Sequence, residues 1–426
     1  MYKEINAPIL AQWEVTSFCN HKCSYCYNFW RDDANIQALP DNFELLFSKI
    51  ADEIITNQVF SVIITGGEPL TVFDRISQYI KRLFENGIWL SMNSNLTLLS
   101  EEIAKKVLDS GIKSILFSIP CYLEEKFEEI THVKGSYRRL LKGIEIAQKF
   151  NFQLYPNMVV SKYNYHDIEK TAEFIKSLGI NYFSATKVSD PTSNNSFKPY
   201  LLDIPEYRNM RIKLEEIGEK FSMKIDSLQA NPVCSYGNYQ PKLGYRNCNA
   251  GRTTIAISPE GNVRPCIMLP LIYGNIMIDG LSKSWKNMSE MRSDDIIPDE
   301  CSECKIKTRC MGGCKADALV AYGTIKSKDP ICDPNYRVKN LAKKVIAEIT
   351  KEEFSINLKN RYRSEPFGGT ILVNTNSFAF VETELYNRIL SGNRIISVEE
   401  IAELLDISKE EAIITASYLF DKKIIL

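Results

Sequence analysis

Short apolar runs alternate with longer amphipathic segments from residue 8 to about residue 190. A short run rich in β-branched residues is typical of a buried strand, whereas apolar residues three or four positions apart indicate a helix with one packed face. The expected strands cover residues 9–16, 59–65, 87–93, 113–119, 153–160 and 182–186. The expected helices cover residues 41–56, 73–85, 100–110, 136–150 and 166–178. Strands that alternate with helices form parallel βαβ units, so the pattern predicts an α/β fold, a partial (β/α)6 barrel of the TIM type.

The second half of the chain follows other patterns. Residues 189–198 are polar and rich in Pro, Asn and Ser, which indicates a boundary, and residues 205–221 predict a bridging helix. Between residues 231 and 334 Cys, Gly and Pro concentrate, so this stretch needs staples to hold its shape. A charged helix is expected over residues 336–354, followed by a small α+β tail in the order strand, strand, helix, helix, helix. We therefore expect three domains, at residues 1–200, 201–345 and 355–426.

Composition narrows the class of protein. Of 426 residues 44% are hydrophobic, and 52 basic side chains against 53 acidic ones leave a net charge of −1. This balance gives no overall attraction to nucleic acid or to anionic membranes. No apolar run approaches the roughly 20 residues that span a bilayer, and the first residues lack a signal-peptide pattern, so we expect a cytoplasmic protein without membrane or nucleic-acid partners. Twelve cysteines beside three histidines favour thiolate metal centres, because disulfides rarely persist in that compartment.

Three of the cysteines follow the first expected strand. Cys19, Cys23 and Cys26 form a CxxxCxxC loop. Three thiolates at this spacing can hold three irons of a [4Fe–4S] cluster and leave the fourth iron open for chemistry. A zinc knuckle or a set of buried thiols is the alternative, but zinc wants a fourth ligand, and His21 lies too close in sequence to fold back easily.

The loop and the segments at the ends of the next strands resemble the radical S-adenosylmethionine (SAM) superfamily. An aromatic residue precedes the third cysteine, a Gly-Gly-Glu-Pro motif ends the second strand, and polar residues end the third and fourth strands. The residues that the resemblance places at SAM are Tyr25, Gly66, Gly67, Glu68, Pro69, Ser94, Asn95 and Ser118. The glutamate and the glycine backbone would receive the amino group of SAM, since a carboxylate attracts an ammonium group. Two positions depart from the family pattern, with Leu96 in place of a glycine and Pro120 in place of an aspartate.

The resemblance also implies a mechanism. SAM would chelate the open iron through its amino and carboxylate groups, and one electron from a donor such as flavodoxin or ferredoxin would then cleave its carbon–sulfur bond. The resulting 5′-deoxyadenosyl radical would abstract a hydrogen atom from the substrate, inside a barrel that keeps water away. This chemistry needs no side-chain acid or base.

A second group of cysteines follows, and its spacing alone is also compatible with a zinc site. Its members are Cys248, Cys266, Cys301, Cys304, Cys310, Cys314 and Cys332. Their order resembles the SPASM extension of radical SAM enzymes that modify peptides and proteins. By resemblance, one auxiliary [4Fe–4S] cluster would be held by Cys301, Cys304, Cys310 and Cys332, and the other by Cys248, Cys266 and Cys314. Seven ligands do not fill eight positions, so either Cys234 supplies the eighth or one iron is open. Cys121 is expected to be a packed thiol, with the mouth of the active site as its alternative place.

The tail supports three interpretations. Residues 363–390 are similar to the small peptide-chaperone protein of pyrroloquinoline quinone biosynthesis, whose relatives recognise the leaders of ribosomally made peptides. An exposed edge strand beside a helix can capture an extended peptide by β-addition. A winged helix on DNA is the second interpretation, but residues 397–426 are mainly acidic, whereas a DNA-binding surface is basic. A structural cap is the third.

Together these features predict an enzyme with three clusters that modifies a precursor peptide with a leader. The expected product is a thioether or carbon–carbon cross-link. Oxidation of a protein Cys or Ser, as in sulfatase maturation, is a second hypothesis. A zinc-bearing regulatory or nucleic-acid-binding protein is a third.

Overall fold

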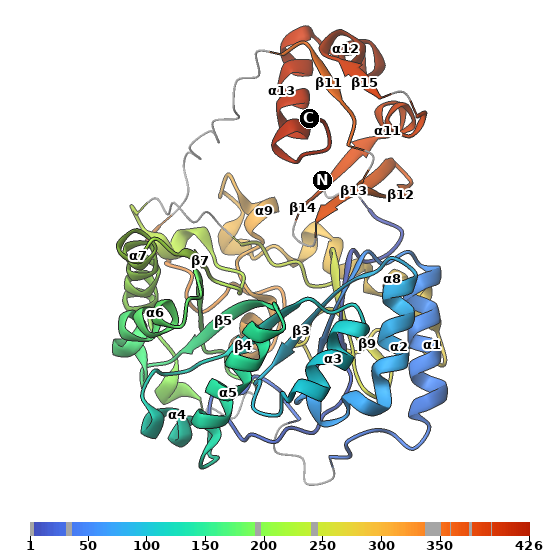
Figure 1. Ribbon diagram of the computed structural model, residues 1–426. Helices are drawn as coiled ribbons and strands as arrows, with labels where there is room; N and C mark the ends of the chain where they lie inside the picture. The colour runs from blue at the N-terminus through green and yellow to red at the C-terminus, as the bar shows by residue number, and fades with distance from the viewer. Residues whose placement is uncertain are drawn as a thin grey trace. The chain divides into compact units, whose positions relative to one another are not determined.

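The computed structural model describes residues 4–30, 36–191, 197–239, 246–336, 351–357, 359–374, 377–392 and 394–426. It divides into two compact units (Figure 1). The larger is Pro8–Asn340, which contains both the expected barrel and the Cys-rich stretch; the smaller joins Met1–Ala7 to Leu341–Leu426. Within the described residues no helix combines the length and apolar composition needed to cross a membrane.

One sheet organises the larger unit, and all six predicted strands belong to it. Its described strands are β1 (Leu10–Glu14), β2 (Ser61–Thr65), β3 (Trp89–Ser94), β4 (Ser114–Ser118), β5 (Gln153–Val160), β6 (Tyr182–Lys187), β7 (Lys224–Asp226), β8 (Thr254–Ile257), β9 (Asn262–Arg264) and β10 (Gly274–Asn275). Strands β1 to β7 follow one another in parallel. On the other edge β8 pairs in parallel with β1 and continues into β9 and β10, which are antiparallel. The predicted partial barrel is therefore confirmed, and the Cys-rich segment extends the same sheet.

Helices connect the parallel strands. They are α1 (Phe43–Thr56), α2 (Phe73–Glu85), α3 (Glu101–Asp109), α4 (Glu124–Thr131), α5 (Ser136–Lys149), α6 (Ile168–Ser177) and α7 (Ile204–Phe221). The starts follow capping rules, since Ser100 accepts a hydrogen bond from the amide of Ile103 at 3.2 Å and Asp203 forms a capping box with Glu206. The sequence analysis did not include α4, because Phe127 and Ile130 are its only large apolar residues.

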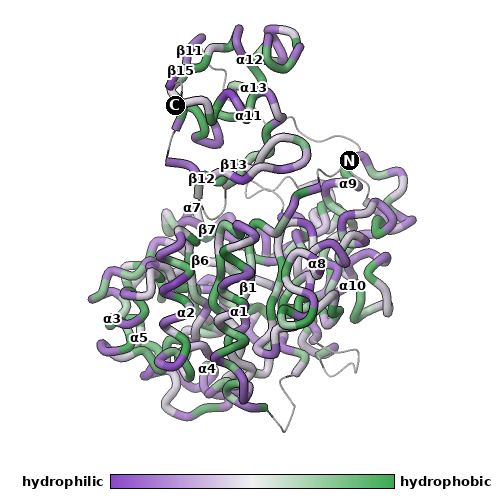
Figure 2. Tube along the Cα trace, turned by 90° about the vertical axis from the view of Figure 1, so that its right-hand side faces the viewer, coloured by the Kyte–Doolittle hydropathy of each residue, from purple (hydrophilic) through white to green (hydrophobic). Residues whose placement is uncertain are grey.

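The two faces of the sheet differ. Side chains such as Trp13, Met92 and Phe117 are fully buried, and Trp13 meets Phe47 of α1 edge to face at 5.0 Å. Helices α1 and α2 alternate between hydrophobic and hydrophilic residues along the tube, as expected for helices with one packed face (Figure 2). The opposite face of the strands carries polar residues, which Gln12, Ser91, Asn93, Ser118, Asn157, Ser184 and Thr186 exemplify. Because side chains alternate along a strand, the apolar face binds the helices and the polar face is available for a site.

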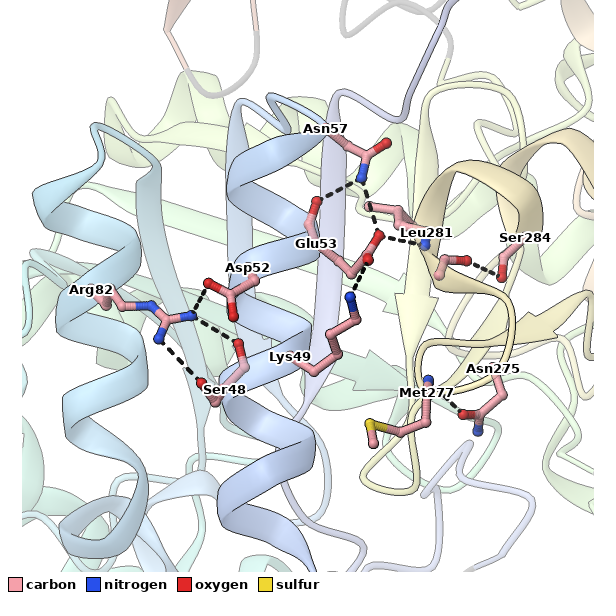
Figure 3. Close-up of polar contacts among 11 residues, drawn as sticks. Ser48, Lys49, Asp52, Glu53, Asn57, Arg82, Asn275, Met277, Leu281 and Ser284 are labelled. Atoms are coloured by element: carbon pink, nitrogen blue, oxygen red, sulfur yellow. Dashed lines mark hydrogen bonds and ion pairs between the residues drawn. The ribbon is translucent and has the colours of Figure 1, made fainter.

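The Cys-rich segment is attached to the barrel at α1. Its described helices are α8 (Gly280–Asn287), α9 (Lys307–Cys310) and α10 (Lys315–Tyr322). Glu53 of α1 accepts a hydrogen bond from the backbone amide of Leu281, in the first turn of α8, at 2.8 Å, and pairs with Lys49 at 2.9 Å (Figure 3). A carboxylate at a helix N-terminus is favourable because the amides there lack partners within the helix.

The smaller unit contains β11 (Glu353–Ser355), β12 (Arg361–Glu365), β13 (Gly368–Asn374), β14 (Ser377–Glu382), α11 (Thr383–Leu390), β15 (Ile395–Ser397), α12 (Val398–Leu405) and α13 (Lys409–Asp421). The predicted order from β13 onward is present, with β15 added. Most of the predicted charged helix, residues 337–350, lies outside the described residues. The prediction is wrong for the end of this helix, because Phe354 pairs with Ile396 in an antiparallel ladder between β11 and β15 and is buried there.

Candidate active site and cysteine centres

The loop after β1 and the Gly-Gly-Glu-Pro segment after β2 are in direct backbone contact. The amide of Gly67 donates to the carbonyl of Thr16 at 2.6 Å, and the amide of Glu68 donates to the carbonyl of Phe18 at 2.8 Å. A Cβ on Gly67 would overlap the carbonyl oxygen of Phe18, and Gly66 has a φ of +134°. Both positions therefore require glycine for the approach of the two segments, and this approach places Glu68 close to Cys19.

Glu68 is a buried carboxylate with its own set of donors. It is 1% exposed and accepts hydrogen bonds from the amide of Asn95 at 2.6 Å, from the hydroxyl of Ser94 at 2.8 Å and from the amide of Leu70 at 3.1 Å. Burial raises the pKa of Glu68 to about 7, although these hydrogen bonds act against the rise. A bound ammonium group would offset the desolvation, so this environment fits the amino group of SAM. Pro69 follows at the start of a short 3-10 turn and fixes the direction of the chain.

A polar network links the cysteine loop to the end of β3. The side-chain Nδ2 of Asn95 donates to Oδ1 of Asn20 at 2.8 Å, and Nδ2 of Asn20 donates to the hydroxyl of Thr97 at 3.0 Å. Leu96 replaces the glycine of the family pattern and still adopts a left-handed conformation, with a φ of +60°. Its amide donates to the Ser94 hydroxyl at 3.0 Å, and its side chain is fully buried. The local turn is therefore kept, at the cost of strain that a glycine would avoid.

Tyr25 and Ser118 lie together. A side-chain hydrogen bond joins them, and burial, followed by the charge of Cys23, raises the pKa of the tyrosine well above its usual range. The sequence analysis placed Tyr25 and Ser118 at SAM from two separate motifs, and the structure brings these two residues into contact. Tyr27, which the sequence analysis did not single out, is hydrogen-bonded to the side chain of Thr65 and lies near both Cys26 and Cys266. It therefore stands between the first cysteine loop and the Cys-rich segment.

The polar face of β5 and β6 adds further residues that the sequence analysis missed. Asn157 accepts hydrogen bonds from Ser184 at 3.0 Å and from Thr186 at 2.9 Å. These residues belong to the predicted strands, and their polarity within otherwise apolar runs was the available signal. The strands place them on the face that carries Ser118, where a substrate or SAM would lie.

At the end of β6 a buried ion pair meets the Cys-rich segment. The ammonium group of Lys187 contacts the carboxylate of Asp317 in α10, with side chains 7% and 6% exposed, and Gln229 donates to Asp317 at 2.9 Å. Burial alone would lower the pKa of Lys187, but the charges of Asp317 and Asp329 raise it. Asp329 in turn accepts a hydrogen bond from the amide of Cys314 at 2.9 Å.

The cysteines of the Cys-rich segment form two neighbourhoods. In the first, the thiols of Cys266 and Cys314 both lie near Cys248. Burial raises the pKa of Cys266 to about 12, so a thiolate at this place needs a positive charge beside it, which an iron cluster supplies. These three are the residues that the resemblance groups into one auxiliary cluster.

The second neighbourhood has Cys310 near Cys301 and Cys332 near Cys310, and Cys304 and Cys310 pack on a small apolar cluster. The Cys234 thiol is hydrogen-bonded to the Cys332 thiol, so Cys234 lies in this neighbourhood. Which of these thiols bind iron stays a prediction. Cys121 is in neither neighbourhood; it is fully buried, and its sulfur accepts a hydrogen bond from the amide of Leu123 at 3.4 Å.

Among the described residues no three His, Cys, Asp or Glu side chains converge closely enough to hold a single metal ion. A cluster of several irons spreads its ligands more widely than one zinc ion does. The donor set of each neighbourhood consists of cysteine, the usual ligand of such clusters.

Two regions of the chain match known families. Residues 13–175 match the radical SAM superfamily, and residues 248–305 match the SPASM iron–sulfur cluster-binding domain. An AdoMet-dependent heme synthase of Methanosarcina barkeri is 28% identical over 345 residues, which are 77% of this chain and 97% of that protein.

Peptide-related proteins are also similar. The antilisterial bacteriocin subtilosin biosynthesis protein AlbA of Bacillus subtilis is 26% identical over 315 residues, which are 70% of this chain and 66% of that protein. Among solved structures, Streptococcus suis SuiB bound to its precursor peptide SuiA has a TM-score of 0.63 at 20% identity, covering 77% of this chain and 76% of that one. This likeness supports the fold.

Proposed function

Because this chain is an enzyme that carries a radical SAM domain followed by a SPASM iron–sulfur domain, we propose that it modifies a ribosomally made precursor peptide. Its cofactors are SAM and [4Fe–4S] clusters. In the proposal the enzyme installs a thioether or carbon–carbon cross-link, receives electrons from a flavodoxin or ferredoxin, and works in the cytoplasm, where its twelve cysteines stay reduced.

Bound together, a reduced [4Fe–4S] cluster and SAM supply a 5′-deoxyadenosyl radical for hydrogen-atom abstraction. The role of this chain is to bind and orient. Cys19, Cys23 and Cys26 would hold the cluster, and Glu68 would fix the amino group of SAM. The polar face of β5 and β6 would position the substrate, and the helix-covered barrel would exclude water.

The observation that carries the peptide proposal is a groove in the smaller unit. It has a volume of about 400 Å³ and lies between β14, α11 and α13. In the described sheet β14 is an edge strand, since the order is β12-β13-β14. The lining combines apolar side chains, such as Leu385, Ile414 and Tyr418, with the carboxylates of Glu382 and Glu411. An extended leader could pair with the outer edge of β14 and place an apolar side chain in the groove.

The test uses the anaerobically reconstituted full chain and peptides encoded by short open reading frames beside its gene. We expect 5′-deoxyadenosine to form together with a peptide lighter by two hydrogen atoms. Ile414→Glu should raise KM for the full-length peptide about tenfold or more, while kcat changes little, because an anchor in a binding groove is worth roughly 1–2 kcal/mol. Ile395→Glu is the matched control, since Ile395 is similarly exposed, at 57% against 56% for Ile414, and does not line the groove.

Equal KM values for the two variants would refute leader binding in this groove. Modification of a short isolated Cys- or Ser-containing peptide at full efficiency, unaffected by Ile414→Glu, would favour the sulfatase-maturation alternative. A colourless protein that binds zinc and no iron would instead support the regulatory alternative.

The similarity to AdoMet-dependent heme synthase supports a second candidate, a reaction on a heme precursor. The same reconstituted enzyme, given a porphyrin precursor of heme instead of peptide, distinguishes the two. Porphyrin conversion with 5′-deoxyadenosine formation would favour this candidate. No porphyrin conversion, with turnover of the peptide, would favour the peptide.

A further inference from the structure

Cys234 lies in the short 3-10 turn Val233–Tyr236, which follows β7. Counting ligands from the sequence suggests that Cys234 completes the set Cys248, Cys266 and Cys314, because that set lacks a fourth thiol. The contacts of the turn point elsewhere, and three of them are independent of one another.

The first contact is apolar packing. Val233, the residue before Cys234, is 6% exposed and forms a small buried cluster with Ile306, which is 4% exposed. Cys304 and Cys310 pack against this pair. The backbone amide of Val233 also donates to the sulfur of Cys310. The turn that carries Cys234 therefore packs against Cys304 and Cys310 of the second neighbourhood.

The second contact is an arginine clamp on the other side of Cys234. Arg208 of α7 donates through Nε to the carbonyl of Ser235 at 2.9 Å and through Nη2 to Oδ2 of Asp333 at 2.9 Å. Ser235 follows Cys234, and Asp333 follows Cys332. One guanidinium group thus holds together the two chain segments that carry these cysteines.

The third contact joins the two side chains directly. The thiols of Cys234 and Cys332 are hydrogen-bonded to each other, and Cys310 is near Cys234 as well. Cys332 is itself held in place, because its sulfur reaches the carbonyl of Gly312 at 3.5 Å and its amide donates to the carbonyl of Asp329 at 2.9 Å.

We propose that Cys234 is an iron ligand of the auxiliary cluster surrounded by Cys301, Cys310 and Cys332, and that the cluster at Cys248, Cys266 and Cys314 takes three thiolates from this chain. The inference rests on the auxiliary clusters of the proposed function. A cubane cluster has four irons, so of the five thiols in the second neighbourhood one is spare. The other cluster would then have one iron open for water or a substrate group, and Cys314, one of the residues that would hold it, lies near the Lys187–Asp317 pair.

The experiment compares alanine variants of Cys234, Cys266 and Cys332 after anaerobic reconstitution and reduction, by electron paramagnetic resonance. Cys121→Ala is the matched control, a thiol removed outside both neighbourhoods. We expect Cys234→Ala to alter the cluster signal that Cys332→Ala alters, and to leave the signal affected by Cys266→Ala as in the control. A Cys234→Ala spectrum equal to the control, or one changed in the signal of the Cys266 cluster, would overturn the assignment.

A second measurement needs no change at Cys234. Alkylation followed by mass spectrometry reports whether the Cys234 thiol is protected once the clusters are loaded. Protection should persist in Cys266→Ala and be weakened in Cys332→Ala; the reverse pattern contradicts the inference. Iron analysis separates this failure from that of the proposed function, since wild type with three clusters binds about twelve irons per chain and a chain with about four has no auxiliary clusters at all.

Discussion

The buried pair of Lys187 and Asp317 allows a quantitative test of how the Cys-rich segment is held to the barrel. Lys187→Met removes the cation and keeps most of the side-chain volume. The carboxylate of Asp317 then stays 6% exposed, with Gln229 as its one described donor. The carboxylate of Asp329, which is 0% exposed, also loses the favourable charge of Lys187 nearby. Breaking a buried pair in this way typically costs about 3–5 kcal/mol, because an uncompensated charge remains. We expect a loss near 3 kcal/mol, since Gln229 still satisfies part of the carboxylate.

The assay is urea unfolding at pH 7, followed by circular dichroism, with the change in midpoint converted through a common slope. The double variant Lys187→Met/Asp317→Leu should recover most of the loss, because a well-packed apolar pair often replaces a buried ion pair at little cost. Lys106→Met is the control; Lys106 pairs with Asp74 and Glu102 at 2.8 Å on the surface, where a pair contributes about 0–1 kcal/mol. A single variant at Lys187 that loses less than about 1 kcal/mol, or a double variant no more stable than it, would refute the reasoning.

Three further predictions concern the barrel. Gly67→Ala should abolish cluster binding at the first cysteine loop, seen as loss of about four irons per chain, because its Cβ would overlap the carbonyl of Phe18; Gly87→Ala, which adds backbone strain at a φ of +76° but no overlap, should keep its iron. Glu53→Gln should lower stability by about 0.5–1 kcal/mol in urea unfolding, since it keeps an oxygen acceptor at the first turn of α8 but loses the charge; an unchanged midpoint would speak against that role. Hydrogen bonds from two lysines of α7 lower the pKa of Glu169 to about 2, so the stability it contributes is present above about pH 4.5 and is lost as the pH falls toward 2. Because the side chain is partly exposed, wild type should exceed Glu169→Gln by only about 0.5–1 kcal/mol at pH 7, and a difference that grows on acidification contradicts the assignment.

Much of the barrel could be predicted from the sequence because its signals are local. The six strands have apolar runs of their own, and Ser100 and Asp203 mark helix starts through contacts within one turn. The glycines of the SAM segment could be identified from the motif, but the sequence does not explain why glycine is required there. Glycine is required because the backbone of Thr16–Phe18, some fifty residues away in sequence, approaches closely.

What could not be predicted depends on long-range pairing. Nothing in residues 254–257 indicates that they pair with β1 rather than only with the following strand. The partner of Cys234 is similarly set by Arg208 and Val233, neither of which carries a metal-binding signal. Lys187 ends β6, one residue beyond the strand predicted over residues 182–186, and the carboxylate that it meets lies 130 residues further along the chain.

The parallel pairing of β1 with β8 has a consequence for synthesis. Leu10 pairs with Thr254, so β1 leaves the ribosome roughly 240 residues before the strand that covers its outer edge. At about 5–20 residues per second this delay is on the order of 10 to 50 s. The helices of the barrel are made during this time, and the first strand keeps one open edge even after β2 has paired with it. An open edge of this kind invites pairing with other chains. Chaperone demand should therefore be highest just before the Cys-rich segment emerges.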